Sequence, residues 1–182
     1  MIEVRWHGRG GQGAVTSVEL LAVSAIAAGK YAQGFPSFGP ERRGAPVAAF
    51  TRIDDKKINV RSGIYEPDIV LVLDSSLIGL VNVVDGLKPG GKIIVNTHKT
   101  PEEIRKDLNF NGSVATVDGT GIARQEMGVP IANTTMIGAL LKVTGIMGLE
   151  AMKESVEHRF GRLAQKNLNA MKRAYDEIKI IN

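Results

Sequence analysis

The chain has 182 residues, of which 43% are hydrophobic and 23% charged, a composition that suits one globular domain and excludes a disordered protein. The formal net charge of +4 is spread along the chain and aromatic residues make up only 5%, which argues against a nucleic-acid binder with a dense basic stripe. The absence of cysteine excludes disulfides, thiolate nucleophiles and a cysteine-ligated iron–sulfur cluster on this chain.

The first part of the chain predicts a strand, a glycine-rich loop and a helix. Residues 2–6 alternate weakly and lead directly into the loop. Residues 13–28 contain no proline and are apolar almost all round, which indicates a helix that is buried on most sides. A second short strand is expected around residues 31–34. The segment 35–46 holds three prolines and two glycines and is predicted to be an ordered loop.

The next segments predict a β-hairpin and a buried strand. Residues 47–53 and 58–61 flank the polar run Asp54–Lys57, which is typical of a hairpin with a polar tip. Residues 68–74 form a continuous apolar run that ends in a carboxylate, a pattern typical of a strand buried on both faces.

The middle of the chain predicts alternating helices and strands. Helices are expected at 76–84, at 101–108, where Pro101 opens the first turn, and at 119–127. Strands are expected at 92–96 and 114–117. This alternation favours a mostly parallel sheet.

The last third of the chain predicts helices. One helix should run from about residue 133 to 143. Apolar residues then recur every three or four positions from Leu149 to Ile178, which fits one long helix or two helices broken near Gly161. We therefore expect a single domain over 1–182, a Rossmann-like three-layer α/β/α fold with a mostly parallel mixed sheet, a β-hairpin and C-terminal helices.

The glycine loop carries the first chemical signal. Gly8, Gly10 and Gly13 satisfy the pattern G-x-G-x-x-G between a predicted strand and a predicted helix. Such glycines allow a tight turn, and the free amides at the helix start attract phosphate oxygens, to which Arg9 can add a charge-assisted contact. The alternative is a turn that only packs the helix onto the sheet.

A dinucleotide site makes a further demand that this sequence does not meet. It needs an Asp or Glu about 20 residues beyond the loop to bind the ribose, or an arginine for a 2′-phosphate. Residues 31–35 supply neither. An independent nucleotide-dependent enzyme, such as a dehydrogenase or a methyltransferase, is therefore disfavoured but stays open, as does a scaffold without a ligand.

The proline-rich loop carries the second signal. Glu41, Arg42 and Arg43 lie in it, and their guanidinium groups suit either an anion contact or a domain or subunit interface. Together, G-R-G-G-Q-G-x-x-T at residues 8–16 and F-G-P-E-R-R-G-A-P-V at residues 38–47 closely resemble the gamma subunits of pyruvate and related 2-oxoacid:ferredoxin oxidoreductases. The resemblance spans the whole chain.

The resemblance implies a function and a set of partners. Enzymes of this family convert a 2-oxoacid and coenzyme A to acyl-CoA and CO2 and reduce ferredoxin. Their thiamine diphosphate lies between alpha and beta subunits, and their [4Fe-4S] clusters lie on delta and beta subunits. The gamma subunit of the heterotetramer then holds no cofactor, no metal and no catalytic residue. It stabilises the assembly and contributes to the coenzyme A site.

The residues that the resemblance places near coenzyme A lie in and after the glycine loop: Gly8, Arg9, Gly10, Gly11, Gln12, Gly13 and Thr16. Fused single-chain relatives carry an acid where Gln12 stands.

The sequence begins without a signal-peptide segment and has no apolar run of membrane-spanning length. We therefore expect a cytoplasmic protein that binds neither membranes nor nucleic acid.

Two further side chains at strand ends have alternative interpretations. His7 ends the first predicted strand beside the loop and suits a proton carrier or a histidine used for hydrogen bonding. Asp74 ends a buried strand, where it suits a ligand contact or the cap of a following helix.

Overall fold

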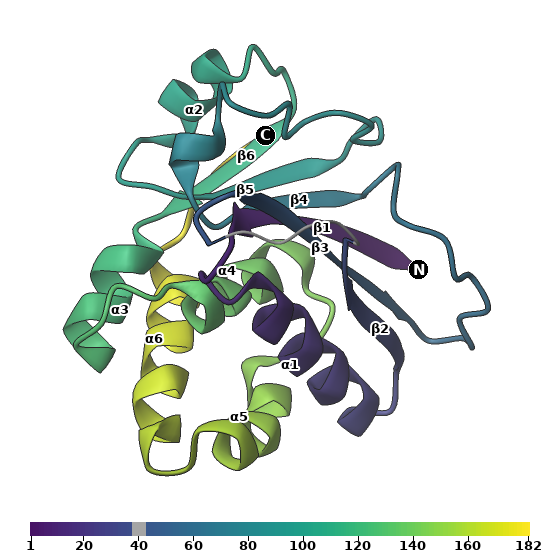
Figure 1. Ribbon diagram of the computed structural model, residues 1–182, viewed down its shortest axis with the longest axis vertical. Coiled ribbons are helices and arrows are strands. Elements are labelled where there is room, and N and C mark those ends of the chain that lie inside the picture. Colours follow the sequence, from purple (N-terminus) through teal and green to yellow (C-terminus); the bar gives the residue numbers. More distant parts are fainter. Residues whose placement is uncertain (38–42) are drawn as a thin grey trace.

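The computed structural model describes residues 1–37 and 43–182. Within them, seven strands form one sheet in the order β2-β3-β1-β4-β5-β6-β7 (Figure 1). The four central strands run parallel, whereas the pairs β2–β3, β3–β1 and β6–β7 are antiparallel. The strands are β1 (Ile2–Arg9), β2 (Tyr31–Pro36), β3 (Pro46–Asp54), β4 (Ile69–Val72), β5 (Lys92–Asn96), β6 (Ser113–Val117) and β7 (Lys179–Ile181).

Helices cover both faces of the sheet. Five of them lie on one face and the short α2 lies on the other (Figure 1), so the α/β class with three layers is confirmed. The helices are α1 (Ala14–Ala27), α2 (Pro101–Asp107), α3 (Gly119–Met127), α4 (Asn133–Thr144), α5 (Lys153–Phe160) and α6 (Ala164–Glu177). None of the helices in the described part of the chain is long and apolar enough to cross a membrane.

Successive side chains of β4 point to opposite faces of the sheet and so belong to two separate core clusters. Ile69 and Leu71 belong to the large cluster beneath α1, α4 and α6, whereas Val70 and Val72 belong to the smaller cluster beneath α2. All four are buried, as expected for a strand covered on both faces. In the larger cluster the fully buried Trp6 donates its indole N–H to Thr51 Oγ1 at 3.1 Å, so its polar edge is satisfied.

The predicted hairpin is wrong in its pairing. Residues 47–53 do lie in a strand, but β3 pairs with β2 on one side and β1 on the other, and residues 58–61 form no strand. Insertion between two neighbours satisfies both edges of β3 and buries Thr51, Arg52 and Ile53, which a two-stranded hairpin cannot do.

The predicted helix at 76–84 is reduced to one 3-10 turn, Ser75–Leu77. The backbone is already extended at Ile78, Gly79 follows at φ +89°, and the chain then packs on the smaller core cluster as an irregular segment. The buried Arg5 guanidinium holds this segment by donating to the carbonyl oxygens of Val83, at 3.1 Å, and Asp85.

The C-terminal helical region is divided into two helices at Gly161. Helix α5 ends at Phe160, a 3-10 turn spans Gly161–Leu163, and α6 follows, which confirms the interpretation as two helices. The strand β7 was not predicted, because Tyr175 and Ile178 continue the helical spacing almost to the end of the chain.

Candidate functional site

The glycine loop joins β1 to α1 and lies against the end of the proline-rich segment. Gly10 N–H donates to the carbonyl of Ala45 at 2.9 Å, and Gly44 N–H donates to the carbonyl of Gly10 at 3.0 Å. An isolated parallel bridge pairs Gly10 with Arg43. The structure therefore brings the first sequence motif and the described end of the second motif into direct contact.

The loop backbone leaves the start of α1 open. Gly11 and Gly13 have φ values of +91° and +79°, a left-handed region that other residues rarely adopt. Gly13 is the N-cap, and no side chain caps the helix. The first amides of a helix have no acceptor within it, so those that begin α1 form a local positive pole suited to an anion.

A hollow of about 250 Å³ lies over this helix start. Five of the seven residues that the family resemblance places near coenzyme A line it, whereas Gly8 is buried in β1 and Gln12 turns toward Asp74. Its lining consists of Arg9, Gly10, Gly11, Gly13, Ala14, Val15, Thr16 and Val47.

Cationic side chains stand beside the hollow. Arg43 is exposed, and its Cγ lies 3.9 Å from the point that a β-carbon on Gly11 would occupy. Arg9 directs its guanidinium to Ser76 Oγ at 2.8 Å and to the carbonyl of Gly44 at 3.0 Å. Glu41 and Arg42, also singled out in the sequence, lie outside the described residues.

Asp74 connects the glycine loop to the neighbouring strand. Its Oδ2 accepts hydrogen bonds from Gln12 Nε2 at 2.7 Å and from Arg9 Nε at 3.2 Å. Its Oδ1 accepts from the backbone N–H of Ser76 at 3.0 Å, so the interpretation of Asp74 as a helix cap is confirmed for the 3-10 turn. Partial burial acts to raise the pKa of this carboxyl, but the hydrogen bonds from Ser76 and Gln12 and the charge of Arg9 outweigh it and lower the pKa.

The site occupies the position where open α/β sheets bind ligands. β1 and β4 are adjacent and parallel, and their connections lead to opposite faces, α1 beneath the sheet and the segment after Asp74 above it (Figure 1). Such a divergence opens a crevice at the carboxyl ends of the strands. The glycine loop and Asp74 lie at this crevice.

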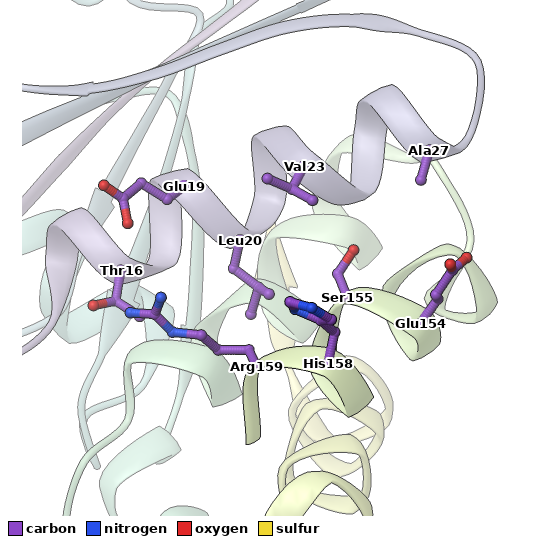
Figure 2. Close-up of a pocket in the computed structure, with 9 residues that line it drawn as sticks. All are labelled: Thr16, Glu19, Leu20, Val23, Ala27, Glu154, Ser155, His158 and Arg159. Carbon is purple, nitrogen blue, oxygen red and sulfur yellow. The ribbon is translucent and has the colours of Figure 1, made fainter. Parts of the chain in front are cut away.

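A larger groove of about 490 Å³ continues from the hollow along α1. Thr16 lines both, and Leu20 and Val23 of α1 face His158 of α5 across the groove (Figure 2). The side chain of Arg159 extends from α5 toward Thr16, which adds a further cation near the start of α1 (Figure 2). Sequence reasoning missed Arg159 because nothing local connects it with a loop some 150 residues earlier.

His7 serves as a hydrogen-bond acceptor within the sheet. Its Nε2 accepts from Arg5 Nε at 3.1 Å. Burial, with the adjacent charge of Arg5, lowers the pKa of His7 to about 4, so the imidazole is neutral near pH 7.

This lowered pKa predicts a loss of stability in acid. Because the unfolded chain binds a proton near pH 6.5 and the folded chain only near pH 4, unfolding takes up a proton between these values. The free energy of unfolding should therefore fall by about 3 kcal/mol as the pH drops through this window, and level off below it. Urea titrations at each pH should show that His7→Gln removes this slope, whereas the exposed His98→Gln control retains it. A slope that survives in His7→Gln would assign the acid sensitivity to other groups.

Comparison with known proteins shows the relationship of the whole chain. The model of the family described as pyruvate ferredoxin/flavodoxin oxidoreductase matches residues 3–177. The "Pyruvate/ketoisovalerate oxidoreductases common subunit gamma" of Thermococcus kodakarensis is 53% identical, with 97% of each chain covered. The crystal structure of the pyruvate oxidoreductase subunit PORC of Thermotoga maritima is 43% identical with a TM-score of 0.88, covering 100% of this chain and 98% of that one.

A more distant structure shares the fold. The 2-oxoglutarate:ferredoxin oxidoreductase of Magnetococcus marinus, solved with 2-oxoglutarate, coenzyme A and succinyl-CoA bound, is 20% identical with a TM-score of 0.73. The similarity covers 97% of this chain but 30% of that longer one. The family model and the two full-length relatives show that the chain belongs to the pyruvate ferredoxin/flavodoxin oxidoreductase family, in which it matches a common gamma subunit over 97% of its length.

Proposed function

We propose that this chain is the gamma subunit of a multi-subunit oxidoreductase that converts a 2-oxoacid, most simply pyruvate, and coenzyme A to acyl-CoA and CO2 while it reduces ferredoxin. In this proposal alpha, beta and delta subunits complete the assembly. The names of the full-length relatives support it. The absence of cysteine from the 182 residues fits a subunit whose partners hold the iron–sulfur clusters and the thiamine diphosphate.

We further propose that the glycine loop forms one wall of the coenzyme A site. The observation that carries this proposal is the uncapped start of α1 behind Gly11 and Gly13. Glycine backbone lets a diphosphate approach closely, and the helix dipole and free amides favour its negative charge. Arg9 and Arg43 beside the hollow are cations of the type that bind phosphate oxygens.

The direct test compares two glycine substitutions in the assembled complex. Gly11→Asp places a carboxylate at the proposed phosphate site and next to Arg43, so the Kd for coenzyme A should rise about tenfold or more, equivalent to about 1.4 kcal/mol. Gly90→Asp is the matched control, because Gly90 has a similar φ of +78° and nothing within 4 Å of an added β-carbon, and lies in the turn before β5. Calorimetric titration with coenzyme A measures both.

Two outcomes would contradict the proposal. An unchanged Kd in Gly11→Asp, in a complex that still contains every subunit, would remove the loop from the coenzyme A site. Tight binding of NAD(H) or S-adenosylmethionine by this chain would instead favour an independent nucleotide-dependent enzyme.

A further inference from the structure

We propose that Asp74 is a positioning residue for coenzyme A binding, because it fixes the conformation of the glycine loop through Gln12 and Arg9. This inference rests on the proposed coenzyme A site. Asp74 stands on another strand, 62 residues from Gln12 in the sequence. We call the hydrogen bonds among Asp74, Gln12 and Arg9 the Asp74 network.

The two carboxylate oxygens of Asp74 have separate partners. Oδ1 accepts from the backbone N–H and the hydroxyl of Ser76, at 3.0 and 2.6 Å, which anchors the carboxylate to the turn after β4. Oδ2 then points at the loop and accepts from Gln12 and Arg9. Because one oxygen is anchored, the position of the other is set by the sheet and not by the loop.

Gln12 transmits this position to the loop backbone. A carboxylate only accepts hydrogen bonds, so the amide of Gln12 must turn its NH2 toward Asp74 and its oxygen toward the loop. That oxygen accepts the backbone N–H of Arg9 at 2.7 Å, while the N–H of Gln12 donates to the carbonyl of Arg9 at 3.0 Å. The side chain therefore closes the turn in which Gly11 takes its left-handed conformation.

The Asp74 network also determines which groups remain for a ligand. The backbone N–H of Arg9 is used by Gln12, and the Arg9 guanidinium is shared among Asp74, Ser76 and the carbonyl of Gly44. In the described part of the site this leaves the uncapped amides at the start of α1, the remaining N–H groups of the Arg9 guanidinium and the exposed Arg43. A loop held in this form before binding loses less conformational entropy when the diphosphate arrives.

A reciprocal exchange of side chains tests the network. Asp74→Asn keeps one oxygen for the cap but turns an NH2 toward the NH2 of Gln12, and Gln12→Glu places a second carboxylate against Asp74. The Kd for coenzyme A should rise about tenfold in each single variant, as expected when a polar pair of this kind is broken. The double variant Asp74→Asn/Gln12→Glu recreates the hydrogen bond between positions 74 and 12 with donor and acceptor exchanged, at the same net charge, and Arg9 keeps its bonds to Ser76 and the Gly44 carbonyl. The double variant should therefore return the Kd to within about threefold of the wild type.

The measurements are made on the assembled complex. KM for coenzyme A should follow the Kd, whereas kcat at saturating coenzyme A should stay near the wild-type value in all three variants. Without coenzyme A, amide exchange of residues 9–16 should be faster in each single variant and slow again in the double variant. Asp107→Asn is the control, because it removes an exposed carboxylate paired with Lys99 at 2.7 Å, away from the loop, and should change neither quantity.

The possible outcomes distinguish the positioning role of Asp74 from the proposed coenzyme A site on which it rests. Rescue of both the Kd and the amide exchange in the double variant supports the positioning role. Wild-type Kd in the single variants, in a complex whose Gly11→Asp form binds weakly, overturns the positioning role and leaves the coenzyme A site standing. Additive losses in the double variant also overturn it, because the side chains then do not act through each other. Wild-type Kd in every variant, Gly11→Asp included, overturns the proposed coenzyme A site and this inference with it.

Discussion

Gly138→Ala is expected to lower the free energy of unfolding by roughly 3 kcal/mol or more, although alanine is the better helix former. Gly138 lies within α4 at its contact with α6, where an added β-carbon would lie 2.7 Å from the carbonyl carbon of Met171 and overlap the carbonyl oxygen. The obstacle is backbone, which no rotamer change can move aside. The two helices would have to separate, and the buried contacts around Met171 would loosen.

The sign of the change decides between helix propensity and packing. Propensity alone predicts a gain of about 1 kcal/mol for Gly138→Ala, whereas the overlap predicts a loss. Gly148→Ala is the matched control, since an added β-carbon there has no atom within 4 Å and the backbone is extended at φ −75° and ψ 160°. Urea unfolding followed by circular dichroism should show a change within about 0.5 kcal/mol for the control. Equal stability of both variants would mean that α4 and α6 are not packed this closely.

Turn and capping residues in the sequence predicted the bounds of those elements that begin and end at such residues. The strand at 92–96 follows a turn at Gly90-Gly91 and has an apolar centre, Ile93–Val95, and the structure reproduces its bounds. The helix at 119–127 begins after its cap Asp118, whose side chain accepts from Gly121 N–H, and ends before Gly128, so its bounds are also reproduced. The glycine loop likewise falls where its pattern predicts, between a strand and a helix.

Contacts between distant residues decided the features that the sequence left open. β3 pairs with β1 and β2 because burial of Thr51 to Ile53 outweighs the local turn signal at Asp54–Lys57. Asp74 suited a ligand contact or a cap, and only the fold shows that it also holds Gln12. Such pairings depend on the order of the strands in the sheet, which no local pattern encodes.

Arg52→Met is expected to lower the free energy of unfolding by about 3 to 5 kcal/mol, because it leaves a largely buried carboxylate without its main partner. Arg52 is 1% exposed, and its Nε donates to Glu3 Oε1 at 2.8 Å. The same guanidinium donates to the carbonyl of Gly63 at 3.1 Å and lies over the ring of Phe35, 5.5 Å from its centre. One side chain thus joins β1, β2, β3 and the irregular segment that follows them.

A second cation on the same carboxylate provides the control for this prediction. Lys88 lies 3.3 Å from Glu3 Oε2 and 2.9 Å from Asp68 Oδ1, but its side chain is 36% exposed. Water solvates and screens such a pair, so Lys88→Met should lower the free energy of unfolding by about 1 kcal/mol or less. Urea unfolding of the two variants therefore measures how far burial, at equal formal charge, sets the strength of an ion pair in this fold. Equal losses would show that the guanidinium acts only as one of two interchangeable charges. The double variant Arg52→Met/Glu3→Gln then tests the cause of a larger loss in Arg52→Met. If the double variant loses less stability than Arg52→Met alone, the difference is due to the unpaired carboxylate of Glu3.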